Sequence, residues 1–303
     1  MMTNWTMRQA LFCLIGSTAC TLVLSLSGYA LWSRSQHTRL NDPAYRISAI
    51  VQTGPEKEAL KTVYLAELLG LSADRETNLY AFDRKKGIEK LLASPLIGKA
   101  EIKRLPPKAL YIDYEVRKPV AWLGDYQNIA IDREGYLFPV APFFSPKELP
   151  EIYLGLPPFG TAEDSAGRKG GLWQTPVENR HLRLAFEILQ FLEGTPWREG
   201  LRIKRIDVSN AFASSLGQRE IVLFTEEELT IVQDGQSIRS IFPKILRLAP
   251  KEYPQQLANF FSLRKSMLED YRRQMALAPH PGRFAPRIVD LRIPQLAFVE
   301  NHS

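Results

Sequence analysis

The longest uninterrupted apolar stretch of the chain lies close to its amino terminus. Residues 9–33 include no charged side chain. At a rise of about 1.5 Å per residue, a helix of this length spans roughly 37 Å, enough to cross a hydrocarbon core of about 30 Å. Tyr29 and Trp32 stand at its distal end, where aromatic side chains favour the membrane interface. The pattern predicts one transmembrane helix over residues 9–33, after a short terminus of residues 1–8 and before a polar linker of residues 34–44.

Other interpretations of this segment stay open. A cleaved signal peptide has a shorter apolar core, of about 7–15 residues, and residues 17–20 (Ser-Thr-Ala-Cys) faintly resemble a lipoprotein cleavage site. The apolar run continues well beyond that cysteine, which favours an uncleaved anchor over a cleaved signal or a buried core helix. Arg8 precedes the segment and Arg34, Arg39 and Arg46 follow it. This count does not favour a cytoplasmic amino terminus, but long domains cross a membrane largely regardless of charge.

The next stretch of chain alternates between strand and helix patterns. Apolar residues at Ile47, Ala49 and Val51 indicate a strand, and Gly70 stands where a helix is expected to stop. The expected elements are a strand over 45–51, helices over 56–69 and 83–93, and strands over 100–105 and 109–116. This order predicts a small α+β unit with two helices on one face of a three-stranded sheet.

The remainder reads mainly as strands. Residues 128–132 and 136–139 flank an Arg-Glu-Gly turn and predict a hairpin. Further strands are expected over 201–208, 219–224 and 228–232, helices over 179–192 and 254–277, and extended chain over 287–299. A loop rich in Pro and Gly covers residues 156–176. The fold class is therefore α+β: one transmembrane helix, a small α+β domain, and a mainly β domain with helices.

Charge and cysteine content change this picture little. The net charge is +6 and the pI about 9.2, but residues 1–46 contain four arginines and one aspartate, so half of the surplus lies beside the apolar segment. No basic stripe interleaved with aromatic residues follows, which argues against nucleic-acid binding. The two cysteines, Cys13 and Cys20, both lie in the apolar segment. Their number excludes a disulfide-rich scaffold and a multi-cysteine metal site.

Candidate chemistry is sparse. The four histidines (His37, His181, His280 and His302) have no ligand spacing, and the sequence contains no P-loop, G-x-G-x-x-G or G-x-S-x-G motif. His181 is best explained as a polar residue at a helix start rather than a member of a catalytic triad. The acidic run of residues 226–228 is best explained as a solvated turn between two strands rather than a cation site. We expect no catalytic residue, no metal site, no cofactor and no small-molecule substrate.

Five short motifs carry a resemblance to a known family. They are SPLIGKAEIKRLP at residues 94–106, LYIDYEVRKPVAW at 110–122, IDREGYLF at 131–138, KILRL at 244–248 and IVDLR at 288–292. In this order, after a single anchor, they resemble the bacterial cell-division proteins FtsQ and DivIB. Two positions depart from the family pattern: Val116 stands where a glutamate is usual, and Ile293 where an aromatic residue is common.

The resemblance implies a fold, a location and a function. It implies a POTRA domain (strand–helix–helix–strand–strand) over residues 45–122 and a β domain over 123–303. It implies a single-pass type II protein of the inner (plasma) membrane, with its bulk in the periplasm or extracytoplasmic space at the division septum. The family is not enzymatic: it is a divisome scaffold that takes part in septum formation during the cell cycle, and it binds the partners FtsB and FtsL through the last strands of the β domain.

The C-terminal pattern fits such a binding edge. Val289, Leu291 and Ile293 alternate, and Pro294 follows directly; proline is confined to edges, bulges or ends of strands. An open edge strand is a template for another chain. We therefore expect residues 290–299 to form an edge that binds a partner through Arg292, Ile293, Leu296, Phe298 and Val299, with Arg292 placed to pair with an acid of the partner. The alternative is that Leu296 and Phe298 merely close the core of the β domain.

Other assignments remain possible. Arg46 and Lys57 could meet acidic partners near the membrane, although ordinary solvated charge explains them more simply. The main rival function is another membrane-anchored envelope protein with a POTRA domain that acts in secretion or transport. A less favoured rival is an anchored envelope hydrolase.

Overall fold

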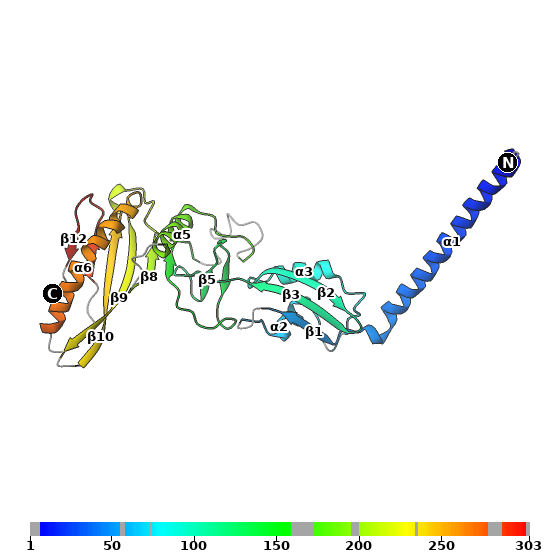
Figure 1. The fold of residues 1–303 in the computed structure, drawn as a ribbon, viewed down its shortest axis with the longest axis horizontal. Helices are drawn as coiled ribbons and strands as arrows, with labels where there is room; N and C mark the ends of the chain where they lie inside the picture. The colour runs from blue at the N-terminus through cyan, green and yellow to red at the C-terminus, as the bar shows by residue number, and fades with distance from the viewer. Residues whose placement is uncertain are drawn as a thin grey trace, which may run out of the picture. The chain divides into compact units, whose positions relative to one another are not determined.

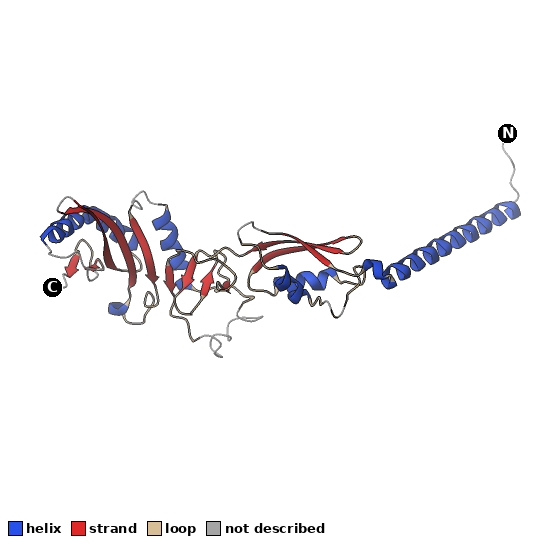
Figure 2. Ribbon diagram, turned by 90° about the horizontal axis from the view of Figure 1, so that it is seen from below, coloured by secondary structure: helices blue, strands red, loops and turns tan. Residues whose placement is uncertain are grey.

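The structure, a computed structural model, describes residues 7–54, 58–72, 74, 76–158, 173–194, 200–233, 236–277 and 287–300. The fold is α+β: a long apolar helix at the amino terminus, a small mixed sheet with helices, and a large mixed sheet. The chain divides into two compact units, Met1–Val116 and Arg117–Ser303 (Figures 1 and 2). Each is described below by itself.

The first unit begins with helix α1 (Met7–Asn41). Its segment Phe12–Asn41 has a mean hydropathy of 1.5 over its most apolar window, none of which is buried in the protein. This one apolar helix is consistent with a single membrane anchor or a signal sequence. Helix α1 continues beyond the predicted transmembrane segment, so residues 34–41 of the expected linker are helical. Residues 34–41 contain no glycine or proline. Asp42 follows, and its side chain accepts a hydrogen bond from the Ala44 N–H at the start of a short 3₁₀ helix, η1 (Pro43–Tyr45).

After η1 the chain forms a three-stranded sheet with two helices. The elements are β1 (Ala49–Thr53), α2 (Thr62–Leu69), α3 (Arg84–Leu92), β2 (Ile97–Leu105) and β3 (Ala109–Val116). The strands lie in the order β1-β3-β2, with β1 parallel and β2 antiparallel to the central β3. Both helices lie along one side of the sheet (Figure 2). The predicted order of elements is confirmed.

Helix α2 begins later than the sequence pattern indicated. Leu60 is buried, yet it lies before the helix, and its N–H donates to the Tyr114 hydroxyl over 2.8 Å. Lys61 has extended backbone angles and precedes the first helical residue, Thr62. An apolar residue can therefore fit a helical pattern while its N–H is held by a side chain of β3. The predicted stop is confirmed, since Gly70 closes the helix with a φ of 69°.

The second unit is built on one nine-stranded sheet. Its strands are β4 (Ala121–Leu123), β5 (Ile129–Ile131), β6 (Leu137–Pro139), β7 (Glu151–Tyr153), β8 (Leu201–Asp207), β9 (Ile221–Gln233), β10 (Gln236–Leu248), β11 (Arg287–Asp290) and β12 (Phe298–Glu300). They lie in the order β12-β11-β10-β9-β8-β7-β4-β5-β6. Helices α5 (Arg180–Glu193) and α6 (Tyr253–Leu277) and the 3₁₀ helix η3 (Leu216–Gln218) complete the unit.

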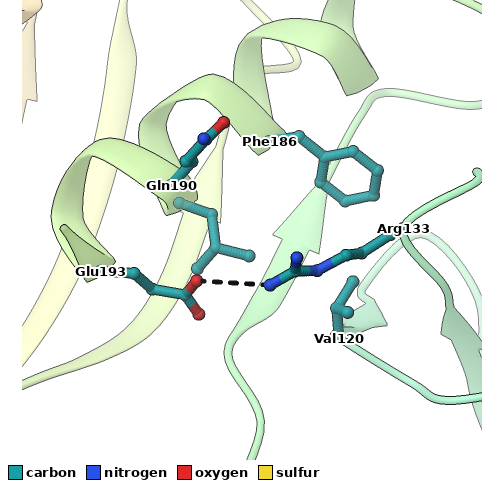
Figure 3. A pocket seen from close by; sticks show the side chains of 6 residues that line it. Val120, Arg133, Phe186, Gln190 and Glu193 are labelled. Carbon is teal, nitrogen blue, oxygen red and sulfur yellow. Dashed lines mark ion pairs between the residues drawn. The ribbon is translucent and has the colours of Figure 1, made fainter.

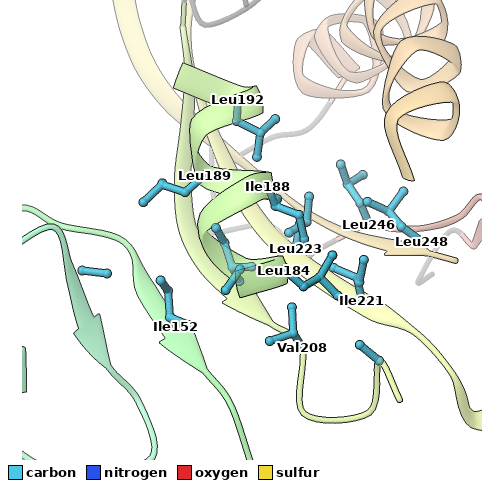
Figure 4. Packing of buried hydrophobic residues seen from close by; sticks show 14 of the residues in the cluster. Ile152, Leu184, Ile188, Leu189, Leu192, Val208, Ile221, Leu223, Leu246 and Leu248 are labelled. Atoms are coloured by element: carbon cyan, nitrogen blue, oxygen red, sulfur yellow. The ribbon is translucent and has the colours of Figure 1, made fainter. Parts of the chain in front are cut away.

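Alternation along β9 and β10 explains the core of this unit. Ile221 and Leu223 point to one face of the sheet, where they meet Leu184 and Ile188 of α5 (Figure 4). The same cluster includes Leu257, Phe260 and Phe261 of α6. The two amphipathic helices thus bury their apolar sides against the middle of the sheet, and the hairpin around residues 132–135 joins β5 to β6 as expected.

The acidic run at 226–228 is the clearest correction. It is not a turn, because β9 is continuous over 13 residues and pairs with β10 through this region. The Glu227 side chain is buried and receives two cations: Lys244 Nζ lies 2.5 Å from Oε2, and Arg264 Nη2 lies 2.5 Å from Oε1. Glu227 interrupts the alternation of apolar residues along β9, and the fold accommodates its buried charge by pairing it with Lys244 and Arg264. Of the loop at 156–176, residues 159–172 lie outside the described part of the chain.

Candidate partner-binding edge

The C-terminal segment forms two strands rather than one. β11 pairs with β10 in parallel and with β12 in antiparallel register, so Asp290 belongs to an inner strand. β12 is the outermost strand, and within the described ranges no strand pairs with its other side. The single extended edge expected over residues 290–299 is therefore wrong; the edge is Phe298–Glu300, and a turn separates it from β11.

The hydrogen-bond pattern shows which backbone groups this edge presents. The Leu291 N–H donates to the Arg247 carbonyl over 2.9 Å, so odd-numbered residues of this segment turn their backbone groups toward β10. Backbone groups alternate along a strand, and Asp290 therefore turns toward β12, where it pairs with Phe298. Val299 lies one residue further along, so its N–H and C=O point away from β11. This residue offers one donor and one acceptor to an added strand.

A tight turn joins the two strands. The Leu296 N–H donates to the Ile293 carbonyl over 3.2 Å, with Pro294 and Gln295 between them. Gln295 has a φ of 62°. Proline at the second position and a positive φ at the third are the features of a type II turn. Pro294 thus lies in the turn that redirects the chain, four residues after β11 ends at Asp290.

Three apolar side chains are exposed around this turn. Ile293 is 62% exposed, Leu296 57% and Phe298 63%. Neither Leu296 nor Phe298 closes the core, so the alternative role suggested for them is wrong. Val299 does pack partly against the core, opposite the buried Val289. The edge therefore combines an open backbone with an apolar surface that the described part of the chain leaves uncovered.

Arg292 is engaged inside the chain. Its Nη2 lies 2.7 Å from Asp290 Oδ2, and its Nη1 lies 3.3 Å from Glu220 Oε2. Arg247 completes the group, with Nη2 2.6 Å from the same Glu220 oxygen and Nη1 3.5 Å from Asp290 Oδ2. The charges of two arginines and two acids thus balance. Arg292, which was expected to pair with an acid of the partner, already pairs with two acids of its own chain.

This ion-pair network shifts the pKa values of Asp290 and Arg292 in opposite directions. Burial alone would raise the pKa of Asp290, but hydrogen bonds from the Arg292 side chain and backbone outweigh it and lower that pKa. The hydrogen bond to Asp290 raises the pKa of Arg292. Sequence reasoning missed Glu220 and Arg247 as members, because only the register of β9, β10 and β11 brings them together. The network holds Arg292 in place directly before the turn that exposes Ile293 and Leu296.

The opposite end of the sheet is less suited to strand addition. The outermost strand there, β6, ends at Pro139, which has no N–H to donate. Asn128 covers the next residues, because its side chain both accepts from the Ala141 N–H and donates to the Ala141 carbonyl, each over 2.9 Å. Of the two outer strands, β12 is the one whose outer edge no described residue covers.

A shallow hollow of about 290 Å³ lies between α5 and the β5–β6 hairpin (Figure 3). Phe186 and Leu189 supply apolar surface, and the Arg133 guanidinium reaches toward Glu193 at 4.0 Å. Val120 and Gln190 complete the lining. These residues include no nucleophile beside a base, so the hollow has the character of a surface depression rather than a reaction site.

The remaining residues singled out in the sequence lie apart from each other. His181 opens α5 and packs edge-on against Phe212, with ring centroids 5.0 Å apart. Burial and the nearby Arg180 lower its pKa, and Asp125 opposes them. His37 lies on α1, Arg46 pairs with Glu76, and Lys57, His280 and His302 fall outside the described residues. Within the described ranges no group of three or more His, Cys, Asp or Glu is placed to hold a metal ion.

Comparison with known proteins adds no assignment. No protein-family model matches the chain, and no curated protein matches it.

Proposed function

We propose that this protein is a membrane-anchored scaffold of the FtsQ/DivIB type, which binds an FtsB–FtsL pair by adding a partner strand to the open side of β12. The observation that carries the proposal is the edge itself: a short terminal strand with outward-facing Val299 backbone groups, beside exposed Ile293, Leu296 and Phe298. Strand addition obtains affinity from backbone hydrogen bonds and specificity from neighbouring side chains. The role needs no catalytic group.

The rest of the chain supports this role. The small unit has the strand–helix–helix–strand–strand order of a POTRA domain, with β1 parallel to β3. Helix α1 supplies a single anchor, so the proposed location is the inner membrane in a type II orientation, with both sheets in the extracytoplasmic space at the division septum. The motifs at residues 244–248 and 288–292 meet in the network of Arg247, Asp290 and Arg292, which fixes the turn beside the edge.

The direct test is to titrate the FtsB–FtsL pair onto the reconstituted full chain. We expect the triple variant Ile293→Ser, Leu296→Ser, Phe298→Ser to bind at least about thirty-fold more weakly, because apolar anchors at an interface contribute about 2 kcal/mol or more each when they lie at its centre. The matched control replaces exposed apolar residues away from this edge, as Val63→Ser with Ile241→Ser. Equal affinity for the triple variant and the control would contradict the proposal.

A cellular test separates division from the rival roles. Depletion of the protein should produce filamentous cells, and a tagged protein should collect at the septum. Normal division after depletion would favour a secretion or transport role for the anchored domains.

A further inference from the structure

The end of the small unit next to α1 gathers three separate segments. The Asn78 side chain donates to the Arg39 carbonyl over 2.9 Å, which joins the loop after residue 76 to the last turns of α1. The Ile47 N–H donates to the Thr77 carbonyl and the Ser48 N–H to the Lys108 carbonyl, each over 2.9 Å. The loop at 76–82 and the β2–β3 turn therefore both lie beside the chain that leaves α1.

Further contacts lock these segments together. Arg104 donates through Nε to the Leu79 carbonyl over 2.8 Å and through Nη2 to the Phe82 carbonyl over 3.0 Å. The Tyr80 ring lies beneath the Arg39 guanidinium, at 5.6 Å, and meets Tyr45 edge-on at 5.0 Å. This surface is therefore built from fixed pieces of the unit rather than from a loose linker.

Charge is distributed unevenly over the unit. The segments near α1 (residues 34–48, 76–86 and 103–109) hold nine arginines and lysines against three acids, a surplus of six positive charges. The other described residues of the unit after α1 (49–54, 58–72, 74, 87–102 and 110–116) hold three lysines against seven acids, a deficit of four. Cations concentrate at the end from which the apolar helix departs.

Some of these cations work against local stability. Arg84, Lys85 and Lys86 occupy the first turn of α3, where they outnumber one acid, the N-cap Asp83, whose side chain accepts from the Lys85 and Lys86 N–H groups. A helix amino terminus favours negative charge, so three cations there are unfavourable for the helix itself. All three are exposed, as is Lys108, and Leu105, the last residue of β2, is 47% exposed. A ligand that supplies negative charge to this end would relieve the repulsion.

We infer that this end of the small unit, the residues 76–86 and 103–109 around the exit of α1, binds the anionic headgroups of the membrane in which α1 is anchored. Arg39 follows the uncharged segment 9–33 by six residues, or about 9 Å of helix. Headgroups extend about 5–8 Å beyond the hydrocarbon core, so the loop held by Arg39 lies at their outer boundary, within reach of lysine and arginine side chains. Lysines and arginines near an anionic surface each strengthen attraction by about 1 kcal/mol, about fivefold. The inference rests on the proposed membrane anchor but not on the proposed partner.

The test is lysine footprinting of the full chain in lipid nanodiscs. Acetylation rates are compared between discs of phosphatidylcholine alone and discs that also contain phosphatidylglycerol. Lys85, Lys86 and Lys108 should react at least about fivefold more slowly in the anionic discs. Lys61 and Lys99, exposed in the same unit but outside the segments near α1, serve as internal references and should change little. Equal rates in the two kinds of disc would overturn the inference.

Matched charge reversals sharpen the result. In Lys85→Glu with Lys108→Glu, the remaining Lys86 and Lys103 should lose their lipid-dependent protection. In the control Lys61→Glu with Lys99→Glu, which changes the net charge equally, protection should persist. Loss of protection in both variants would overturn the inference, because net charge alone would then explain it.

Two further measurements separate the possible causes. Inorganic phosphate added to phosphatidylcholine discs at matched ionic strength should leave the rates unchanged; protection there would contradict a lipid surface and indicate a small-anion site. Affinity for the FtsB–FtsL pair should be the same for the reversal variant and the wild type, so failure of the lipid inference and failure of the proposed partner are distinguishable.

Discussion

The buried ion cluster between β9, β10 and α6 makes an asymmetric prediction about stability. Glu227 receives both Lys244 and Arg264, and the side-chain exposures are 4%, 0% and 15% in that order. Removing one partner of a buried charge pair costs about 3–5 kcal/mol, because the other charge is left without compensation. Glu227→Gln leaves two cations in that position, so the free energy of unfolding should fall by about 3–5 kcal/mol.

Lys244→Met should behave differently. Burial, the largest influence, lowers the pKa of Lys244 even though Glu227 opposes it, so the ammonium group is poorly compensated in place. The variant still leaves Glu227 paired with Arg264, and the methionine keeps contact with Phe242, whose ring centroid lies 4.5 Å from Lys244 Nζ. The expected change is under about 1.5 kcal/mol in either direction, since a buried pair often gives little net stability over an apolar replacement.

The assay is urea unfolding of the full chain followed by hydrogen exchange. Peptides from β9, β10 and α6 report on this unit alone, which avoids assuming that the two units unfold together. A loss below about 1 kcal/mol for Glu227→Gln would show that the cluster is solvated and refute the reasoning. Equal losses for the two variants would refute the claimed asymmetry.

Three other outcomes follow from the same structure. Because the folded-state pKa of Asp290 is lowered, its contribution to stability is present above its ordinary value of 3.8 and is lost as the pH falls through the lowered value; the difference in unfolding free energy between wild type and Asp290→Asn should therefore shrink on acidification. Because the pKa of His181 is also lowered, the unfolded chain binds more protons than the folded chain just below pH 6.5. The free energy of unfolding should therefore decrease as the pH is lowered through this range, and His181→Phe should remove that slope in a urea titration. An epitope placed before Met7 should remain on the mature protein and stay in the membrane after carbonate extraction; its loss would indicate a cleaved signal sequence.

Much of the fold could be predicted from periodicity alone. The two amphipathic helices α5 and α6 lie close to their expected positions, because each buries one continuous apolar face. The hairpin of β5 and β6 lies close to its expected position because an Arg-Glu-Gly turn marks it in the sequence. The three-residue strands β4 and β7 were not predicted, because they pair with each other in parallel and no hairpin turn marks them in the sequence. β10 was not predicted because its first half mixes polar and apolar residues without alternation and Pro243 follows in the middle of the strand; its pairing with β11 begins at the next residue, Lys244. Such features depend on long-range pairing, which local patterns do not encode.

The candidate edge lies within the C-terminal segment that the sequence indicated, but it is a separate strand, β12, rather than one strand over residues 290–299. Pro294 lies in the turn between β11 and β12, so no strand continues through it, and Leu296 and Phe298 are exposed. The sequence could not show that Arg292 is neutralised by Asp290 and Glu220, because Glu220 lies far away along the chain and meets it only through strand register. The sequence also could not show that the Val299 N–H and C=O point away from β11, because this follows from the hydrogen bond between Leu291 and Arg247 and from the register of β11 and β12.

The central claim concerns that backbone. Val299→Pro removes the N–H that faces an added strand, while the pairing of β12 with β11 uses Phe298 and Glu300 instead. Val299→Ala is the matched control, since it shortens the side chain but keeps the donor. An unpaired carbonyl left on the partner costs about 1–3 kcal/mol, so loss of the donor should weaken binding by about tenfold or more.

The decisive measurement is the affinity of the reconstituted full chain for the FtsB–FtsL pair, compared between these two variants. We predict that Val299→Pro binds at least about tenfold more weakly than Val299→Ala, with β11 and β12 equally protected from hydrogen exchange in the unbound proteins. Equal affinities for the two variants would contradict strand addition at β12 and, with it, the proposed function.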